Sequence, residues 1–459
     1  MAAHRRTLVI FGAGGDLSTR LLLPGLGQLL AADRGIELEL IGASNAELTA
    51  EAWQDLLRTA FAKGGADPEA TEPVVAGSRY VVADATDADD LRRILGHCET
   101  APVLYFALPP AVTEASCRAL DTIELPDGIS LALEKPFGTD LASAAALNRF
   151  VSRLAPESRV HRVDHFLGKS TVLNLLGLRF ANRVFEQSWN AENIEKIEIH
   201  YDESLGLESR AGYYDKAGAL VDMVQSHLLL VLALATMEPP STLDADDLRG
   251  AMAQALRATH LWPGETDQVA RRARYTAGTI DGRELLSYAE EEGVDPALET
   301  ETLAEITLTV DNWRWAGVPI VLRSGKALDA TRKDIVVTFK PVPHLPTGFT
   351  SAPSPTLLRI ALDPNGIQLD INVNGEGDPF TLETVSLETD LGAGQLDAYG
   401  EVLAGILTGD PSISVRADVA EECWRIITPI LEAWKKGAVP LDEYSAGSTG
   451  PAHWADRTH

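Results

Sequence analysis

Two patterns of hydrophobic residues alternate along the first third of the chain. Short apolar runs predict buried strands, and the stretches between them carry apolar residues at the spacing of amphipathic helices. The predicted strands are Leu8–Phe11, Glu37–Ile41, Tyr80–Ala83, Val103–Ala107, Ser130–Leu133 and Arg159–Val163. The predicted helices are Leu21–Ala32, Glu47–Ala62, Asp87–Leu95, Val112–Leu120 and Leu141–Leu154. This alternation is typical of parallel βαβ units, so residues 1–162 are predicted to form one doubly wound domain.

The rest of the chain has a different pattern. Two apolar segments, Leu175–Phe180 and Gly218–Met237, predict buried helices. Alternating runs predict strands at Ile194–His200, Ala304–Val310, Ile320–Leu322, Ile335–Phe339, Leu357–Ile360, Ile367–Val373 and Thr381–Leu387. No helical segments separate the later runs, which favours antiparallel pairing. Residues 163–459 are therefore predicted to form an α+β domain with a large, mainly antiparallel sheet.

Charge and composition narrow the class of protein. The 459 residues include 39 basic and 67 acidic ones, which gives a net charge of −28 and argues against a nucleic-acid partner. Cys98, Cys117 and Cys423 form no disulfide framework. The apolar stretch Leu228–Met237 is short for a bilayer span, and the N-terminal residues do not resemble a signal peptide. A cytoplasmic protein without a membrane partner is expected.

A glycine-rich segment, Gly12-Ala13-Gly14-Gly15-Asp16-Leu17, follows the first predicted strand and precedes a helical pattern. Such glycines let the backbone approach a pyrophosphate, and the next helix N-terminus attracts that anion. The spacing is not the full GxGxxG motif, so a structural turn with Asp16 as a helix cap is the alternative. The second strand leads into Ser44 and Asn45, with neither an acid for ribose hydroxyls nor a base for a 2′-phosphate.

Two further strands lead into proline-containing segments, Ala107-Leu108-Pro109-Pro110 and Glu134-Lys135-Pro136-Phe137-Gly138. Ligands of open α/β sheets bind at the carboxyl ends of strands, so both segments are candidates for a ligand site. Lys135 would place a cation near a nicotinamide and its substrate. The alternative is a surface lysine paired with Glu134.

A polar cluster lies in the segment Arg162-Val163-Asp164-His165-Phe166-Leu167-Gly168-Lys169-Ser170. An acid, an imidazole and an ammonium beside a helix start suit an anionic substrate. A helix-capping turn with a solvated salt bridge is the alternative. If the strand extends this far, Asp164 and Phe166 lie on one side of it and His165 on the other.

The predicted helix from Gly218 is apolar nearly all round, which predicts that it is buried. Its polar residues Asp222, Gln225 and His227 then need partners. On an α-helix Asp222 and His227 would lie about 140° apart, so they need not touch. A lone buried histidine is more often a satisfied core residue than a catalytic one. No His, Cys, Asp or Glu grouping has convincing metal spacing, so no metal is predicted.

These segments together resemble the glucose-6-phosphate dehydrogenase family along nearly the whole chain. The matching stretches are IFGAGGDLSTRLLLPGL, YFALPP, EKPFG, RVDHFLGKSTVLNLLGLRFAN, GYYDKAGALVDMVQSHLLL, MEPP, RWAGVPIVLRSGKAL and ECWRIITPILEAW. The resemblance implies a Rossmann-like domain and an α+β domain whose sheet often forms a dimer, so a homodimer or homotetramer is expected. It implies oxidation of glucose 6-phosphate, a sugar phosphate, at its anomeric carbon to 6-phosphogluconolactone with NAD or NADP. That reaction is the first step of the oxidative pentose phosphate or Entner–Doudoroff route.

The resemblance also implies roles for individual residues. His227 matches the general base for the anomeric hydroxyl, and Asp164 matches the carboxylate that orients its imidazole. Lys169 and Lys135 match lysines that hold the sugar and its reacting end. The other implied substrate contacts come from His165, Phe166, Glu203, Asp222 and Lys326. The implied cofactor contacts come from Gly12, Gly14, Gly15, Asp16, Leu17, Ser44, Asn45, Leu108, Pro109, Lys135 and Pro136.

Several positions depart from the family pattern. Phe166 replaces a phosphate-holding tyrosine, Ser226 an asparagine, Thr331 a basic residue beside Arg332, and Ala361 a glutamine. These differences favour weak glucose 6-phosphate binding or a different or modified hexose. NADP-preferring members carry an arginine at the position of Asn45 and a hydroxyl residue at that of Gly14, so NAD is the expected cofactor, and Arg20 is the residue that could restore NADP binding. A non-catalytic scaffold subunit is a third hypothesis, disfavoured because His227, Asp164, Lys169 and Lys135 are retained.

Overall fold

The computed structural model describes residues 4–32, 36–208, 211–392 and 394–454. The chain divides into two compact units that are interleaved along the sequence. The first unit takes its residues from 1–170, 240–253 and 393–424, and the second from 171–239, 254–392 and 425–459. The chain thus returns twice to its first unit. The division of function between residues 1–162 and 163–459 stays a prediction.

A six-stranded parallel sheet forms the centre of the first unit, with strand order β3-β2-β1-β4-β5-β6. Its strands are β1 (His4–Phe11), β2 (Ile36–Ser44), β3 (Arg79–Val82), β4 (Pro102–Phe106), β5 (Ser130–Glu134) and β6 (Val160–Val163). Every strand predicted for this region is confirmed, as is the doubly wound, Rossmann-like class. The strand order reverses between β1 and β4, which is the switch point where such sheets bind their ligands.

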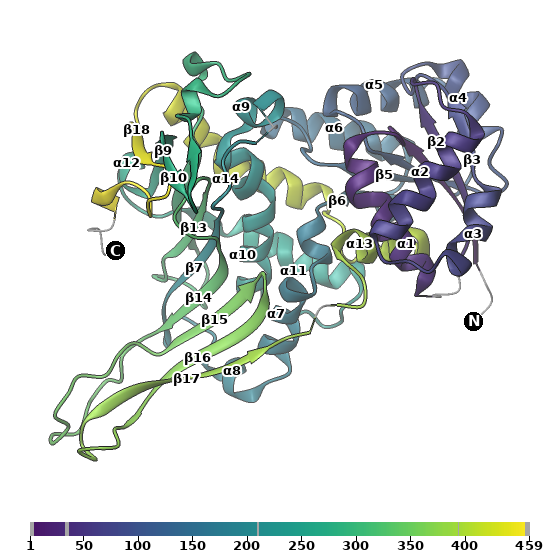
Figure 1. The fold of residues 1–459 in the computed structure, drawn as a ribbon. Helices are drawn as coiled ribbons and strands as arrows, with labels where there is room; N and C mark the ends of the chain where they lie inside the picture. The colour runs from purple at the N-terminus through teal and green to yellow at the C-terminus, as the bar shows by residue number, and fades with distance from the viewer. Residues whose placement is uncertain (1–3, 33–35, 209–210, 393, 455–459) are drawn as a thin grey trace. The chain divides into compact units, whose positions relative to one another are not determined.

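The helices of the first unit form two groups, of which α1, α2, α3 and α13 pack together and α4, α5 and α6 pack together (Figure 1). They are α1 (Leu23–Ala31), α2 (Ala50–Lys63), α3 (Pro68–Gly77), α4 (Ala88–Leu95), α5 (Pro110–Leu120), α6 (Leu141–Leu154) and α13 (Ala398–Thr408), with the π-helical segment η1 (Ser18–Leu22) and the 3-10 turns η2 (Glu157–Arg159) and η3 (His165–Gly168). The hydrophobic pattern does not predict α3, which carries an internal proline, Pro73. Its start is nevertheless capped by the Asp67 side chain.

A ten-stranded sheet dominates the second unit, with the order β17-β16-β15-β14-β7-β13-β12-β9-β18 and β8 paired to β12. Its strands are β7 (Ile194–Asp202), β8 (Thr259–Leu261), β9 (Ala270–Thr276), β12 (Leu303–Val310), β13 (Ile320–Gly325), β14 (Arg332–Phe339), β15 (Leu357–Leu362), β16 (Asn365–Asn374), β17 (Leu382–Asp390) and β18 (Leu441–Ser445). All the strands predicted for this region are confirmed. Pairing is antiparallel except between β13 and β7 and between β18 and β9. The alternation missed β9 because its sequence, ARRARYT, holds three arginines.

The remaining elements of the second unit, with three helices (α7, α11 and α14) that include residues of both units, complete the fold (Figure 1). They are α7 (Ser170–Phe180), α8 (Arg183–Ser188), α9 (Ala211–Ala219), η4 (Leu220–Leu228), α10 (Leu229–Thr236), α11 (Ala245–Arg257), α12 (Thr266–Val269) and α14 (Ala417–Lys435), the hairpin β10 (Gly278–Ile280) and β11 (Arg283–Leu285), and turns η5 (Tyr288–Glu290), η6 (Pro296–Leu298) and η7 (Ala452–Trp454). Among the described residues, one helical run, Ala211–Thr236, is long and apolar enough to cross a membrane, but 83% of its apolar window is buried in the protein. Such burial is typical of a core helix.

Candidate functional site

The glycine turn connects the ends of three strands in the first unit. Gly12 has a φ of +77°, and a Cβ at this position would lie 2.3 Å from the Ala107 carbonyl oxygen. The Gly12 amide donates to the Ala43 carbonyl at 2.8 Å, and the Gly15 amide and Ser18 hydroxyl donate to the Gly12 carbonyl at 2.9 Å. Only glycine fits at position 12. The predicted cofactor segments after β1, β2 and β4 therefore share one edge of the sheet.

The end of β2 carries small polar side chains. Ser44 is half-buried and Asn45 is exposed, and the Ser44 hydroxyl accepts a hydrogen bond from the Ala46 amide at 3.3 Å. Arg20 lies in the helical segment after the glycine turn, 3.4 Å from the Asp16 carboxylate, and both side chains are largely exposed. An Arg20 guanidinium that is to bind a 2′-phosphate would thus exchange one anionic partner for another.

Lys135 follows β5 directly and is joined to Pro136 by a cis peptide bond. The neighbouring Glu134 carboxylate accepts a hydrogen bond from the Tyr105 hydroxyl at 2.6 Å. Burial raises the pKa of Glu134 to about 7, against the opposing effects of Tyr105 and Lys135. Glu134 is therefore a partly buried acid whose partner is Tyr105. This differs from the alternative interpretation, in which Glu134 and Lys135 form an exposed ion pair at the surface.

The cluster after β6 lies in a tight turn. The strand ends at Val163, and the Asp164 side chain caps η3 by accepting a hydrogen bond from the Phe166 amide at 3.0 Å. The strand alternation that would separate Asp164 from His165 therefore does not extend to these residues. His165 stacks on Tyr399 with 5.5 Å between ring centroids, and the Lys169 ammonium lies 4.2 Å from the Phe166 ring centroid. The capping role of Asp164 is confirmed, and the imidazole and ammonium each lie against an aromatic ring.

The helix that carries Asp222 and His227 is not a regular α-helix. Between α9 and α10, residues 220–228 form the π-helical segment η4. Hydrogen bonds of a π-helix join residues five positions apart, so side chains with this spacing lie close to one face. Asp222 and His227 have this spacing, and both are buried. The separation of about 140° predicted from α-helical geometry is therefore wrong, because the helix type differs.

Lys326 and Glu203 form an ion pair in the second unit. The Lys326 ammonium lies 2.6 Å from the Glu203 carboxylate and 5.3 Å from the centroid of the Tyr214 ring. The lysine is buried and the glutamate half-buried, so little water surrounds the pair. Lys326, expected near the phosphate of the substrate, and Glu203, expected near its sugar hydroxyls, are thus direct neighbours.

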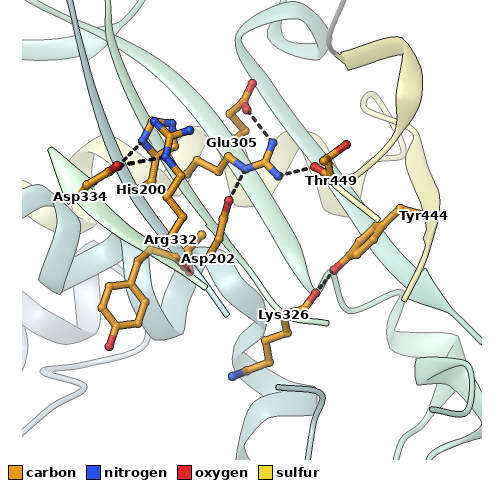
Figure 2. Close-up of polar contacts among 12 residues, drawn as sticks. His200, Asp202, Glu305, Lys326, Arg332, Asp334, Tyr444 and Thr449 are labelled. Carbon is orange, nitrogen blue, oxygen red and sulfur yellow. Dashed lines mark hydrogen bonds and ion pairs between the residues drawn. The ribbon is translucent and has the colours of Figure 1, made fainter. Parts of the chain in front are cut away.

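Thr331 and Arg332 occupy the position where the family pattern has a basic residue. The Thr331 hydroxyl lies 3.1 Å from the Ser204 hydroxyl. Arg332 bonds to the Asp334 carboxylate at 3.1 Å, and Figure 2 shows the same carboxylate beside His200. Since Asp334 engages the guanidinium, Arg332 is not a simple replacement for the missing cation.

The segment 300–302, which precedes β12, has no role predicted from the sequence. Its three residues bond to the backbone of Asp215, Leu220 and Lys326, all within the second unit. No motif or spacing in the sequence ETETLAE indicates these contacts.

Asp164 belongs to the first unit and His227 to the second. The pairing of these two side chains, on which the proposed catalysis depends, therefore stays a prediction. So do the assignments of the other substrate and cofactor residues.

The fold and these residues define a class of protein. A doubly wound sheet with a glycine turn at its switch point is typical of dinucleotide-dependent oxidoreductases. The second unit adds a buried histidine and acid on one helical face, together with a buried lysine, as a polar substrate region requires.

Comparison with known proteins identifies the family. The family model "Glucose-6-phosphate dehydrogenase, NAD binding domain" matches residues 9–174, and "Glucose-6-phosphate dehydrogenase, C-terminal domain" matches 176–458. The chain is 40% identical to the glucose-6-phosphate 1-dehydrogenase of Gluconobacter oxydans, over 96% of this chain and 94% of that protein. A crystal structure of the Mycobacterium avium enzyme superposes with a TM-score of 0.86 at 32% identity, over 98% of this chain and 95% of that one. A glucose-6-phosphate dehydrogenase in complex with its substrate gives a TM-score of 0.87 at 28% identity, over 99% and 97% of the two chains.

The chain therefore belongs to the glucose-6-phosphate dehydrogenase family. The expected fold class and the expectation of an enzyme of this kind are confirmed, and so is a domain for a nicotinamide nucleotide.

Proposed function

We propose that this protein oxidises the anomeric carbon of glucose 6-phosphate to 6-phosphogluconolactone, with NAD preferred over NADP as the hydride acceptor. The observation that carries the proposal is the buried π-helical face with His227 and Asp222, in a chain that matches the family over residues 9–458. The relative whose structure contains glucose 6-phosphate as its substrate supports the choice of sugar.

In this mechanism His227 acts as the general base. Its imidazole takes the proton of the anomeric hydroxyl, and the Asp164 carboxylate holds the imidazole in the required tautomer and stabilises its cation. Lys169 and Lys135 hold the sugar at its reacting end, while Glu203 and Asp222 bind its hydroxyls. His165 and Lys326 provide positive or donor groups for the phosphate. A bound nicotinamide nucleotide supplies the hydride acceptor for the anomeric carbon.

The first unit fits such a nucleotide. The glycine turn, with Gly12 tight against Ala107, leaves no side chain where the pyrophosphate of a dinucleotide approaches the backbone. Gly14, Gly15, Asp16 and Leu17 continue the turn into the helix start, which favours an anion. The other proposed contacts follow neighbouring strands, at Ser44, Asn45, Leu108, Pro109, Lys135 and Pro136.

The preference for NAD rests on the end of β2. A 2′-phosphate binds best to a guanidinium, and Asn45 offers only a neutral amide. Arg20, the residue that could restore NADP binding, already has the Asp16 carboxylate as its neighbour. Binding a 2′-phosphate would require Arg20 to give up Asp16, so the gain in binding free energy is smaller than for an arginine without an acidic neighbour.

A second candidate function is the same oxidation of a different or modified hexose. The observation that favours it is the loss of polar groups on the proposed phosphate side. Phe166 has no hydroxyl, Thr331 bonds to Ser204, and Arg332 bonds to Asp334. Ser226 is buried in η4, and Ala361 lies on β15 opposite Asp334. A weaker cationic environment would lower the affinity for a phosphate more than for a neutral group.

The deciding experiment measures initial rates by NADH or NADPH absorbance, with glucose 6-phosphate, glucose and hexoses altered at the six position. The proposed function predicts the highest kcat/KM for glucose 6-phosphate with NAD. A higher kcat/KM for another hexose would establish the second candidate, and a higher value with NADP would refute the cofactor preference. Binding without turnover of any sugar would indicate the scaffold subunit.

Family membership also supports a cytoplasmic homodimer or homotetramer that performs the first step of the oxidative pentose phosphate or Entner–Doudoroff route. The outer strand β17 exposes Val385 and Leu387, with Phe380 just before it, which suits pairing of the sheet with a second copy. Light scattering after size-exclusion chromatography measures the oligomeric state, and a monomer at micromolar concentration would contradict this part of the proposal.

A further inference from the structure

The tripeptide Thr300-Glu301-Thr302, here named the tether, makes one bond from each residue to a different part of the second unit. The Thr300 hydroxyl donates to the Asp215 carbonyl of α9 at 2.6 Å. The Glu301 carboxylate accepts from the Leu220 amide, the first residue of η4, at 2.9 Å. The Thr302 carbonyl accepts from the Lys326 amide at 2.9 Å. Three consecutive residues therefore join two helical segments and the loop after β13.

Glu301 fits closely against the start of the π-helical segment. Gly218 has φ +65° and ψ 178°, which breaks the helix before η4, and a Cβ at Gly218 would lie 2.3 Å from the Glu301 Oε1 atom. The Ala219 amide also donates to the Glu301 backbone carbonyl at 3.3 Å. The carboxylate thus fills the space that any larger residue 218 would need. Its bond to the Leu220 amide therefore lies at the first residue of η4, where a helix leaves amides without an intrahelical partner.

The Lys326 backbone is held by the same segment. The Tyr444 hydroxyl donates to the Lys326 carbonyl at 2.6 Å, as Figure 2 shows, and lies 2.9 Å from the Thr302 hydroxyl. The Lys326 amide and carbonyl are therefore both fixed through Thr302, directly or through Tyr444. A shift of the tether would move Lys326 and η4 together.

We infer that Glu301 is a positioning residue for the oxidation, because its bond to Leu220 sets the π-helical register that brings Asp222 and His227 to one face. The next residue, Thr302, holds the Lys326 backbone, so the same tether positions both parts of the site. The inference rests on the proposed roles of His227 and Lys326. Glu301 itself is placed against backbone groups, and no contact with the sugar is assigned to it. Burial raises the pKa of Glu301 to about 7, so both the charged and the neutral carboxyl offer an oxygen to the Leu220 amide near neutral pH.

The test compares Glu301→Ala with Glu301→Gln in the full-length enzyme. The glutamine keeps an acceptor oxygen and nearly the same volume, whereas the alanine removes the cap of η4. We expect Glu301→Ala to lower kcat about tenfold and Glu301→Gln about threefold or less, with the KM for the nicotinamide nucleotide unchanged in both. The matched control is Glu292→Gln, an exposed acid earlier in the same connecting segment. It should leave all kinetic constants as in the wild type.

A double-mutant cycle with Gly218→Ala examines the close fit. The added methyl meets the Glu301 carboxylate in the wild type, and Glu301→Ala removes those atoms, so Gly218→Ala should reduce kcat less in the second background. The backbone strain of an alanine at φ +65° is common to both backgrounds. Equal effects in both backgrounds would show that Glu301 does not set the start of η4, and would overturn the inference.

Hydrogen exchange followed by mass spectrometry separates this inference from the proposed function, since it needs no turnover. Peptides that cover residues 220–228 should exchange at least about tenfold faster in Glu301→Ala than in Glu301→Gln, while β1 and β4 are unchanged. Unchanged exchange in 220–228, a wild-type kcat in Glu301→Ala, or equal losses in the alanine and glutamine variants would each overturn the role of Glu301. Absence of turnover in the wild type would instead refute the proposed function and leave the exchange result valid.

Discussion

The cofactor region of the first unit and the polar region of the second are built in different ways. In the first unit each candidate residue follows the end of a parallel strand, so Gly12, Asn45 and Lys135 reach one sheet edge through local chain direction. In the second unit Asp222, His227 and Lys326 come from a helix and a loop that distant residues hold together. The first arrangement follows from the fold class itself. The second depends on a few buried polar bonds, each of which must be satisfied.

Removal of the imidazole tests the second region most strongly. His227→Ala should lower kcat by about 10²–10⁴, because a positioned general base contributes a factor of this size. The urea midpoint of unfolding should stay close to that of the wild type, so that the loss of kcat is not a loss of folded protein. Steady-state rates with saturating glucose 6-phosphate and NAD measure the effect, and His260→Ala, at a half-exposed histidine outside the candidate site, is the control. A rate equal to the wild type would remove His227 from the mechanism.

The glycine turn tests the first region. Gly12→Ala places a methyl 2.3 Å from the Ala107 carbonyl at a φ of +77°, so the turn must open. We expect the KM for NAD to rise about thirtyfold or more, which corresponds to roughly 2 kcal/mol of lost binding. Gly77→Ala is the matched control, since a Cβ there meets nothing within 4 Å and α3 carries no proposed cofactor contact. Similar KM values for the two variants would show that the tight turn does not hold the nucleotide.

The difference between the regions also explains what the sequence could predict. The strand periodicity predicted the parallel sheet of the first unit, and the candidate cofactor residues follow directly from it because each lies next to a strand end. The π-helical form of residues 220–228 was not predictable from hydrophobic spacing, since its apolar residues fit an α-helix equally well. Glu301 was missed because its partners, Gly218 and Leu220, lie some eighty residues earlier in the chain. Long-range bonds to backbone amides leave no pattern in a single sequence.

The partly buried acid beside Lys135 allows a test by pH. The pKa of Glu134 is about 7 in the folded protein against 4.5 for a free glutamate, so between these values the folded state binds more protons than the unfolded state. Its contribution to stability therefore falls as the pH rises through this window. Glu134→Gln carries no charge, so its unfolding free energy relative to the wild type should rise by about 2 kcal/mol from about pH 5 to about pH 8.

Urea unfolding at the two pH values measures this change, with Glu114→Gln as a control at an exposed glutamate on α5. A difference between Glu134→Gln and the wild type that does not vary with pH would mean that the carboxyl titrates normally. The cofactor edge would then hold no neutral acid near physiological pH.

The smallest expected effect is a change of cofactor preference, because this preference depends on one exposed side chain, Asn45. The polar region of the second unit depends instead on several buried bonds. Asn45→Arg supplies a guanidinium directly after β2, where a 2′-phosphate of a bound nucleotide is expected. The ratio of kcat/KM for NADP to that for NAD should rise about tenfold, since a charge-assisted bond contributes about 1.5–3 kcal/mol before solvent screening at an exposed site. Asn45→Gln, which adds length without charge, should leave the ratio unchanged, and kcat with NAD should stay near the wild-type value in both. If Arg20→Ala rather than Asn45→Arg moved the ratio, discrimination would belong to the helix after the glycine turn and not to the strand end.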